Sequence, residues 1–246
     1  MIDSSVFWVA GPYTVTLVFI AGMVWRYRYD RYGWTSRSSQ IYESRLLRIA
    51  SPMFHTGILL ALLGHIGGLV IPAEVTSAVG ISESLYHAVA VALGSFAGLL
   101  VVVGLIALIY RRRTNTRVFL VTTRMDKLMY VVLGTVTGLG VWNTLGVQLF
   151  GVGGYAGGYN YRETVSVWFR SIAWFQPRPE LMMHAPLSFQ LHIIAAMLLI
   201  AITPVTRLVH IFSVPVGYLS RPYLVYRSRD AATRPVQRGW EPTQTR

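Results

Sequence analysis

The chain has 246 residues, of which 53% are hydrophobic and only 13% are charged. This composition is too apolar for a soluble domain, in which about 25% of residues are charged. The net charge of +12 is compatible with nucleic-acid binding, but the basic residues form no recognition motif. The chain has no cysteine, which excludes structural disulfides, thiolate-bound haem and an iron–sulfur cluster held by this chain.

Five apolar runs are long enough to cross a membrane as helices, which takes about 20 residues each. They cover residues 6–25, 50–71, 86–110, 128–150 and 187–209. The opening "MIDSS" lacks the basic segment of a signal peptide, so we expect the first run to remain as a helix. We predict an all-α integral membrane protein with one five-helix domain, residues 1–226, and a polar cytoplasmic tail, residues 227–246.

Basic residues are unevenly distributed among the connections between these runs. Residues 26–48 and residues 111–127 carry six basic residues each, and the stretch from Arg207 onward carries seven. In contrast, residues 72–85 carry none and residues 151–186 carry three. Because cytoplasmic connections are enriched in Lys and Arg, this distribution places the N-terminus outside and the C-terminus in the cytoplasm. Five crossings agree with that orientation.

Histidines are concentrated on two of the predicted helices. The second helix carries His55 and His65, and the fifth carries His192 and His210. A histidine within a membrane is costly, so it either forms a functional site or makes a hydrogen bond across a helix interface. Since the two helices run in opposite directions, we expect His65 to face His192 near the outside and His55 to face His210 near the cytoplasm.

The two histidine pairs have unequal spacings along their helices. Ten residues in the second helix rise about 15 Å, and eighteen in the fifth rise about 27 Å. Eighteen residues make five helical turns, which places His192 and His210 on one face, whereas His55 and His65 are about 80° apart. We expect tilt, ligand reach and a bend at Pro204 to absorb the mismatch.

Haem is the group that best suits opposed imidazoles from different helices. Zinc needs three or four ligands that converge, often from close spacings, and neither helix offers them. Glycines beside the histidines of the second helix allow a macrocycle to approach, although glycine is also common in membrane helix packing. They are Gly57, Gly64, Gly67 and Gly68. Two axial histidines leave no open iron position, so the predicted chemistry is electron transfer.

The other candidate residues have two interpretations each. His87 and His184 lie at the outer boundary, where they either serve quinol binding and proton release or are solvated interfacial residues. Arg207 and Arg221 lie near His210, where they either pair with haem propionates or are ordinary cytoplasmic-side arginines.

The stretches "FHTGILLALLGHIGG" and "RLVHIFSVPVGYLSRPY" resemble the gamma subunit of respiratory nitrate reductase, a membrane cytochrome b with two haems. The resemblance extends to about Tyr226. It implies oxidation of menaquinol or ubiquinol, and partnership with an iron–sulfur beta subunit and a molybdopterin-containing alpha subunit. The resemblance implies that His65 and His192 ligate the iron of the outer haem, and His55 and His210 that of the inner haem.

The chain departs from this family at the quinol site. Better-known members have a lysine near the start of the third helix that is implicated in quinol binding. Here the one lysine is Lys127, on the predicted cytoplasmic side, so that role has no direct counterpart. The candidates for the quinol site are Gly64, Glu83, Tyr86 and His87.

We therefore predict a subunit of the cytoplasmic membrane that oxidises quinol near the outer face and passes electrons inward through two b haems. The chain has no ligands for molybdenum, so nitrate reduction itself would belong to a partner. One alternative is the dihaem anchor of another quinone-linked reductase. A less favoured alternative is a haem-free transporter, which is expected to carry paired carboxylates at mid-membrane, whereas Glu74, Glu83 and Asp126 lie at the boundaries.

Overall fold

The computed structural model describes residues 4–213, and every regular element in that range is helical. The described residues up to Phe212 form one compact unit. Within residues 4–213, five helical spans are long and apolar enough to cross a membrane, as predicted. They contain α1 (Ser4–Tyr29), α2 (Leu47–His65), α4 (Glu83–Thr114), α6 (Arg124–Val141) and α9 (Leu187–Ile202). The predicted domain boundary near residue 226 lies outside the described residues.

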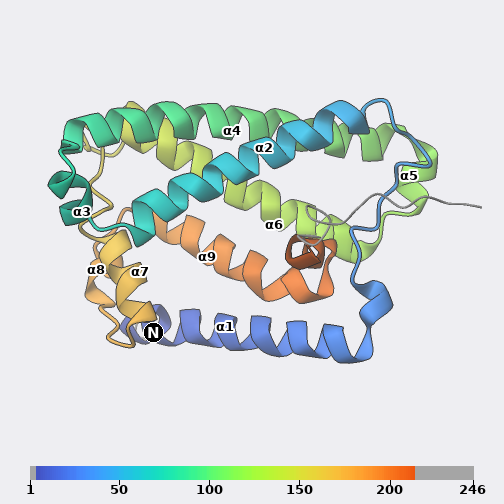
Figure 1. The fold of residues 1–246 in the computed structure, drawn as a ribbon, viewed down its shortest axis with the longest axis horizontal. Coiled ribbons are helices and arrows are strands. Elements are labelled where there is room, and N and C mark those ends of the chain that lie inside the picture. The colour runs from blue at the N-terminus through green and yellow to red at the C-terminus, as the bar shows by residue number, and fades with distance from the viewer. Residues whose placement is uncertain (1–3, 214–246) are drawn as a thin grey trace, which may run out of the picture. The chain divides into compact units, whose positions relative to one another are not determined.

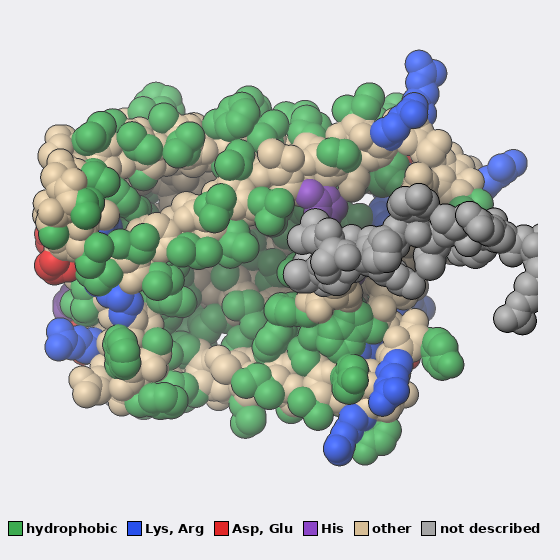
Figure 2. Space-filling view, in the orientation of Figure 1, with side chains coloured by type: hydrophobic (Ala, Val, Ile, Leu, Met, Phe, Trp, Pro, Cys, Tyr) green, Lys and Arg blue, Asp and Glu red, His purple; other side chains and the backbone are tan. Residues whose placement is uncertain are grey.

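Shorter helical segments gather at the two ends of the long helices (Figure 1). At one end, which we call the α3 end, lie α3 (Ala73–Ala78), α7 (Val165–Ala173) and α8 (Glu180–Met183). At the other, the α5 end, lie η1 (Arg31–Gly33) and α5 (Thr116–Leu120). Two spans finish with π-helical turns at the α3 end, η2 (Ile66–Val70) after α2 and η3 (Trp142–Leu149) after α6. Figure 2 shows hydrophobic side chains along the helices and arginine or lysine at the ends, as a membrane protein requires.

The α2 and α4 helices pack closely because glycines lie where they cross. A Cβ on Gly57 of α2 would be only 2.8 Å from the backbone nitrogen of Val101 in α4. On the α4 side, a Cβ on Gly104 would be 2.8 Å from the Cα of Phe54. Neither glycine tolerates a side chain without separating the helices, which is the usual role of small residues in membrane packing.

Tryptophans join α1 to α7 at the α3 end. Trp8 is 3% exposed and Trp168 is 4% exposed, and their rings meet edge to face with centres 5.6 Å apart. The indole nitrogen of Trp168 donates to the carbonyl of Trp8 over 3.1 Å. The Tyr13 hydroxyl also donates to the carbonyl of Ile172. These contacts bind α1, the first helix in the chain, to the segment between α6 and α9.

The fifth span is shorter than the predicted 187–209 helix. The α9 helix ends at Ile202, and η4 (Thr203–Val205), a 3-10 turn, contains Pro204. Proline cannot donate the next helical hydrogen bond, and the chain is extended at Thr206 before η5 (Arg207–Ser213). The prediction that His192 and His210 share a face of one continuous helix is therefore wrong. The expected bend at Pro204 is confirmed, and it brings His210 back toward the bundle.

A buried ion pair holds this returning segment at the α5 end. Asp126 is 1% exposed and caps α6 through a reciprocal pair of hydrogen bonds with Thr123. The guanidinium of Arg207 donates to Asp126 from two nitrogens, each over 2.8 Å. Arg207 is therefore paired with a carboxylate of the protein, while Arg221 lies outside the described residues.

Candidate functional site

Four histidines, two on α2, one on α9 and one on η5, form two facing pairs. The ring centres of His65 and His192 are 6.1 Å apart, and those of His55 and His210 are 6.3 Å apart. The structure thus brings the rings together in the pairs expected from antiparallel helices. One pair lies toward the α3 end, where α2 finishes and α9 begins, and the other toward the α5 end.

All four rings use the same nitrogen to bind the backbone. In each ring Nδ1 lies within hydrogen-bond distance of a carbonyl oxygen, so Nδ1 carries the proton and donates it, and Nε2 keeps a lone pair that is free to bind a metal. The carbonyl partners are Ser51 for His55, Ala61 for His65, Val136 for His192 and Arg207 for His210. This is the arrangement that orients histidines bound to metals through Nε2.

The distance between paired rings fits a metal-centred macrocycle. Two imidazoles on opposite sides of one metal have ring centres about 6.3 Å apart, since metal–nitrogen bonds are about 2.0–2.1 Å and each ring nitrogen lies about 1.1 Å from its centre. The measured values, 6.1 and 6.3 Å, match this spacing. Four imidazoles in two facing pairs fit the number and spacing of ligands that two bis-histidine haems require.

The rings on α2 are not covered by protein. The side chains of His55 and His65 are exposed although both lie within a membrane span, and a Cβ on Gly64, next to His65, would find no atom within 4 Å. Figure 2 shows a hollow between α2 and α1 on the face in view. A ring nitrogen without a partner, here Nε2, is costly within a membrane span, so the exposed side of these rings suits a bound group.

The two remaining histidines are placed differently. His87 uses Nε2 to bind the side-chain oxygen of Gln148 at 3.1 Å, and Gln148 in turn donates to the carbonyl of Tyr159. This nitrogen is therefore already partnered, unlike that of the four paired histidines. His184 is exposed at the end of α8.

A pair of tyrosines lies close to α2 beyond His65. The hydroxyls of Tyr86 and Tyr161 are 3.3 Å apart. A Cβ on Gly68, three residues after His65, would be 3.2 Å and 3.0 Å from these two oxygens. Burial and the hydrogen bond with Tyr86 raise the pKa of the Tyr161 phenol above its ordinary value, so this hydroxyl stays protonated at neutral pH.

A buried arginine connects this pair to the surface of the α3 end. The Arg162 guanidinium lies 3.9 Å from the centre of the Tyr86 ring. It pairs with Glu83 over 2.7 Å and donates to the hydroxyl of Thr76 over 3.0 Å. The Arg162 side chain is only 3% exposed, whereas that of Glu83 is 51% exposed. Glu83 therefore links a buried cation to solvent.

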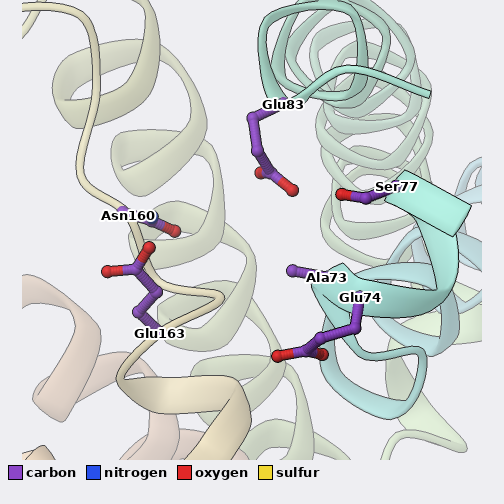
Figure 3. Close-up of a pocket in the computed structure, with 6 residues that line it drawn as sticks. All are labelled: Ala73, Glu74, Ser77, Glu83, Asn160 and Glu163. Carbon is purple, nitrogen blue, oxygen red and sulfur yellow. The ribbon is translucent and has the colours of Figure 1, made fainter. Parts of the chain in front are cut away.

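A cavity of about 450 Å³ opens where Glu83 reaches the surface (Figure 3). It lies between α3, the start of α4 and the chain before α7. Three carboxylates face the cavity from these segments. Its lining residues are Ala73, Glu74, Ser77, Glu83, Asn160 and Glu163.

Comparison with known proteins identifies the family. A family model described as nitrate reductase gamma subunit matches residues 4–229. The chain belongs to the nitrate reductase gamma subunit family. It is 38% identical to the nitrate reductase gamma chain of Bacillus subtilis (strain 168), across 92% of this chain and 99% of that protein. It is 32% identical to the respiratory nitrate reductase 2 gamma chain of Escherichia coli (strain K12), across 89% of this chain and 94% of that protein.

A further relative is a much longer protein than this chain. The nitrate reductase-like protein NarX of Mycobacterium tuberculosis is 54% identical across 96% of this chain, but the match covers 36% of that protein. The chain thus spans about a third of the length of this relative. The resemblance inferred from the two histidine-containing stretches is confirmed at the level of the family.

Two residues at the α3 end of this gamma subunit, Tyr161 and Arg162, were not among the predicted site residues. Their partners Tyr86 and Glu83 were. The tyrosines are separated by 75 positions, so no local spacing relates them. The one available signal was an arginine in an outer connection that carries few basic residues.

Proposed function

We propose that this chain is the quinol-oxidising membrane subunit of a respiratory nitrate reductase and that it holds two b haems. The observation that carries the proposal is the pair of ring separations, 6.1 and 6.3 Å, together with free Nε2 atoms on all four histidines. Membership of the gamma subunit family supports the same assignment.

Each haem would be held by one histidine from α2 and one from the chain beyond it, in α9 or η5. His65 and His192 would hold the outer haem, and His55 and His210 the inner one. Haem bound by two imidazoles has no open iron position, and so it supplies one-electron transfer. The chain's own contribution is to fix the rings through their Nδ1–carbonyl hydrogen bonds and to surround them with apolar helices.

The orientation of the proposed subunit follows from charge. Arginines are abundant in the connections at the α5 end and sparse at the α3 end, so we place the α5 end in the cytoplasm and the α3 end outside. The iron–sulfur beta subunit and the molybdopterin-containing alpha subunit would then dock at the α5 end. The membrane would be the cytoplasmic (inner) membrane.

Quinol would bind at the α3 end beside His65. Among the four predicted quinol-site residues, Gly64 has open space around it and Tyr86 lies close to the same helix at Gly68. Glu83 and His87 are held by Arg162 and Gln148 at the same end. With no lysine here, the polar groups available to a quinol are phenol, imidazole and carboxylate.

Oxidation outside and electron delivery inside would conserve energy. Moving an electron inward against an inside-negative potential costs about 2.3 kcal/mol per 100 mV. The redox energy of quinol oxidation would thereby be stored as membrane potential.

Haem quantitation with a redox difference spectrum tests this proposal. We expect two b-type haems per chain, reduced by a quinol analogue in the complex, and co-purification with iron–sulfur and molybdenum subunits. A colourless preparation would contradict the proposal and favour a haem-free transporter. Haem without a molybdenum subunit would favour the anchor of another quinone-linked reductase.

A further inference from the structure

The hydrogen-bonded tyrosines lie between the space beside α2 and the outer surface. Tyr161 and Tyr86 both approach Gly68, one helical turn beyond His65. A phenol can accept a hydrogen bond on its oxygen while donating its own proton. Two phenols 3.3 Å apart can therefore pass a proton from one to the other without either becoming charged.

Arg162 connects this pair to Glu83. Its guanidinium covers the Tyr86 ring at 3.9 Å and holds the Glu83 carboxylate at 2.7 Å. Glu83 is also one helical turn before Tyr86 on α4. Because arginine does not release its proton in proteins, its role here is to orient the carboxylate beside the phenol.

The same arginine marks a position for water. Its Nε is buried without a hydrogen-bond partner in the protein. Buried polar groups of this kind are normally met by an ordered water molecule. The guanidinium edge that carries Nε also carries the nitrogen that donates to Thr76, so a water there would lie beside Thr76.

Glu83 opens into the cavity of the α3 end. Its carboxylate faces the same space as those of Glu74 and Glu163 (Figure 3). Half of the Glu83 side chain is exposed, so a proton that reaches it can pass to solvent. Polar groups thus lie at intervals from Gly68 of α2 to the surface, and Tyr86 and Glu83 are one helical turn apart on α4.

We propose that Tyr161, Tyr86 and Glu83 form the exit route for the protons of quinol oxidation, with Arg162 as a positioning residue. This inference rests on the proposed function. A quinol loses two electrons and two protons to become a quinone. The electrons leave inward as proposed above, and the protons leave outward.

The route handles one proton at a time. Tyr161 accepts a proton from a quinol hydroxyl and gives its own to Tyr86. Tyr86 gives its proton to the Glu83 carboxylate, one helical turn away on α4, which releases it into the cavity. Each group then has its original protonation, so two passages serve one quinol.

The test uses the whole complex and the variants Tyr161→Phe and Glu83→Gln. Stopped-flow absorbance follows haem reduction by a short-chain quinol analogue in H2O and in D2O. We expect the haems of both variants to be reduced about a hundredfold more slowly, at the lower end of the range for lost proton-transfer catalysis, and to show at least a doubled solvent isotope effect. Glu83→Asp, which keeps a carboxylate, should recover most of the rate.

The matched control is Tyr159→Phe, which removes a phenol hydroxyl from the same connection but one that donates to Thr164. Haem content and reduction by dithionite should be unchanged in every variant, which separates a lost route from a misfolded subunit. Wild-type rates and isotope effects in Tyr161→Phe and Glu83→Gln would overturn the inference. If the quinol analogue failed to reduce the wild-type complex, the proposed function itself would be overturned.

Discussion

Gly140 of α6 lies against the ring of His192 in α9. A Cβ on Gly140 would be only 3.1 Å from Cε1 of that ring. One helical turn earlier, the carbonyl of Val136 accepts the hydrogen bond from Nδ1 of His192. The α6 helix therefore fixes both the position and the tautomer of a histidine that another helix carries.

Replacing Gly140 by alanine should disturb the His65–His192 pair alone. The methyl group would displace the His192 ring by a few tenths of an ångström, and we expect about tenfold weaker haem retention at this pair, as for other changes behind metal-bound histidines. Gly138→Ala is the control, because a Cβ there meets nothing within 4 Å. Haem titration with difference spectra would show this. Equal haem retention in the two variants would mean that α6 does not position His192.

Single histidine replacements should sort into two spectral classes. Alanine at His65 or His192 should remove one haem signal, and alanine at His55 or His210 the other, because each pair shares one macrocycle. Low-temperature absorbance spectra and haem quantitation of each purified variant would measure this, with about one haem remaining of two.

The controls for this series are His87→Ala and His184→Ala, which should keep both haems. If either lost a haem, or if His65→Ala and His192→Ala lost different ones, the assignment of ligands would be wrong.

Asp126→Asn should destabilise the α5 end strongly. It would leave Arg207, which is 11% exposed, without its counter-charge, and breaking one side of a buried ion pair typically costs about 3–5 kcal/mol. The free energy of unfolding of the purified subunit in detergent would measure the loss. Glu74→Gln removes a charge from an exposed residue with no ion pair among the described residues, and should cost less than about 1 kcal/mol. Similar losses in both variants would refute a special role for the buried pair.

Glu43 should make the connection between α1 and α2 sensitive to acid. Burial alone would raise the pKa of Glu43, but hydrogen bonds from the Leu46 N–H and the Arg111 guanidinium outweigh it and leave the pKa below its ordinary value of 4.5. Since the folded pKa is the lower one, the ionised group stabilises the fold fully above about pH 4.5, and this contribution is lost as the pH falls through the folded value.

Glu43→Gln tests this pH dependence. The variant should melt about 2–5 °C below wild type at pH 7, and the difference should shrink as the pH is lowered below 4.5. Thermal unfolding of both proteins across that pH range gives the comparison. A difference that stays constant down to pH 3.5 would show that Glu43 acts by packing and not by charge.

Much of the fold could be predicted because the bilayer imposes it. Each span must satisfy its backbone groups internally over about 20 residues, so apolar run lengths predicted five helices whatever their packing. The antiparallel order of α2 and α9 then followed from their place in the chain, and with it the histidine pairs. The end of α9 was harder to predict from the sequence. Pro204 ends the helix only when the following chain finds other partners, such as Asp126 for Arg207.

The sequence by itself determined the number of spans, the two histidine pairs and the family, since each depends on length, order or local motif. The tertiary structure alone decided the separation of the paired rings, the shared use of Nδ1 for backbone carbonyls, and the contact between Gly140 and His192. It also decided which residues meet Tyr86 and Glu83 at the α3 end. The reason is that helix packing brings together residues that lie tens of positions apart, and no periodicity within one helix encodes its neighbour's register.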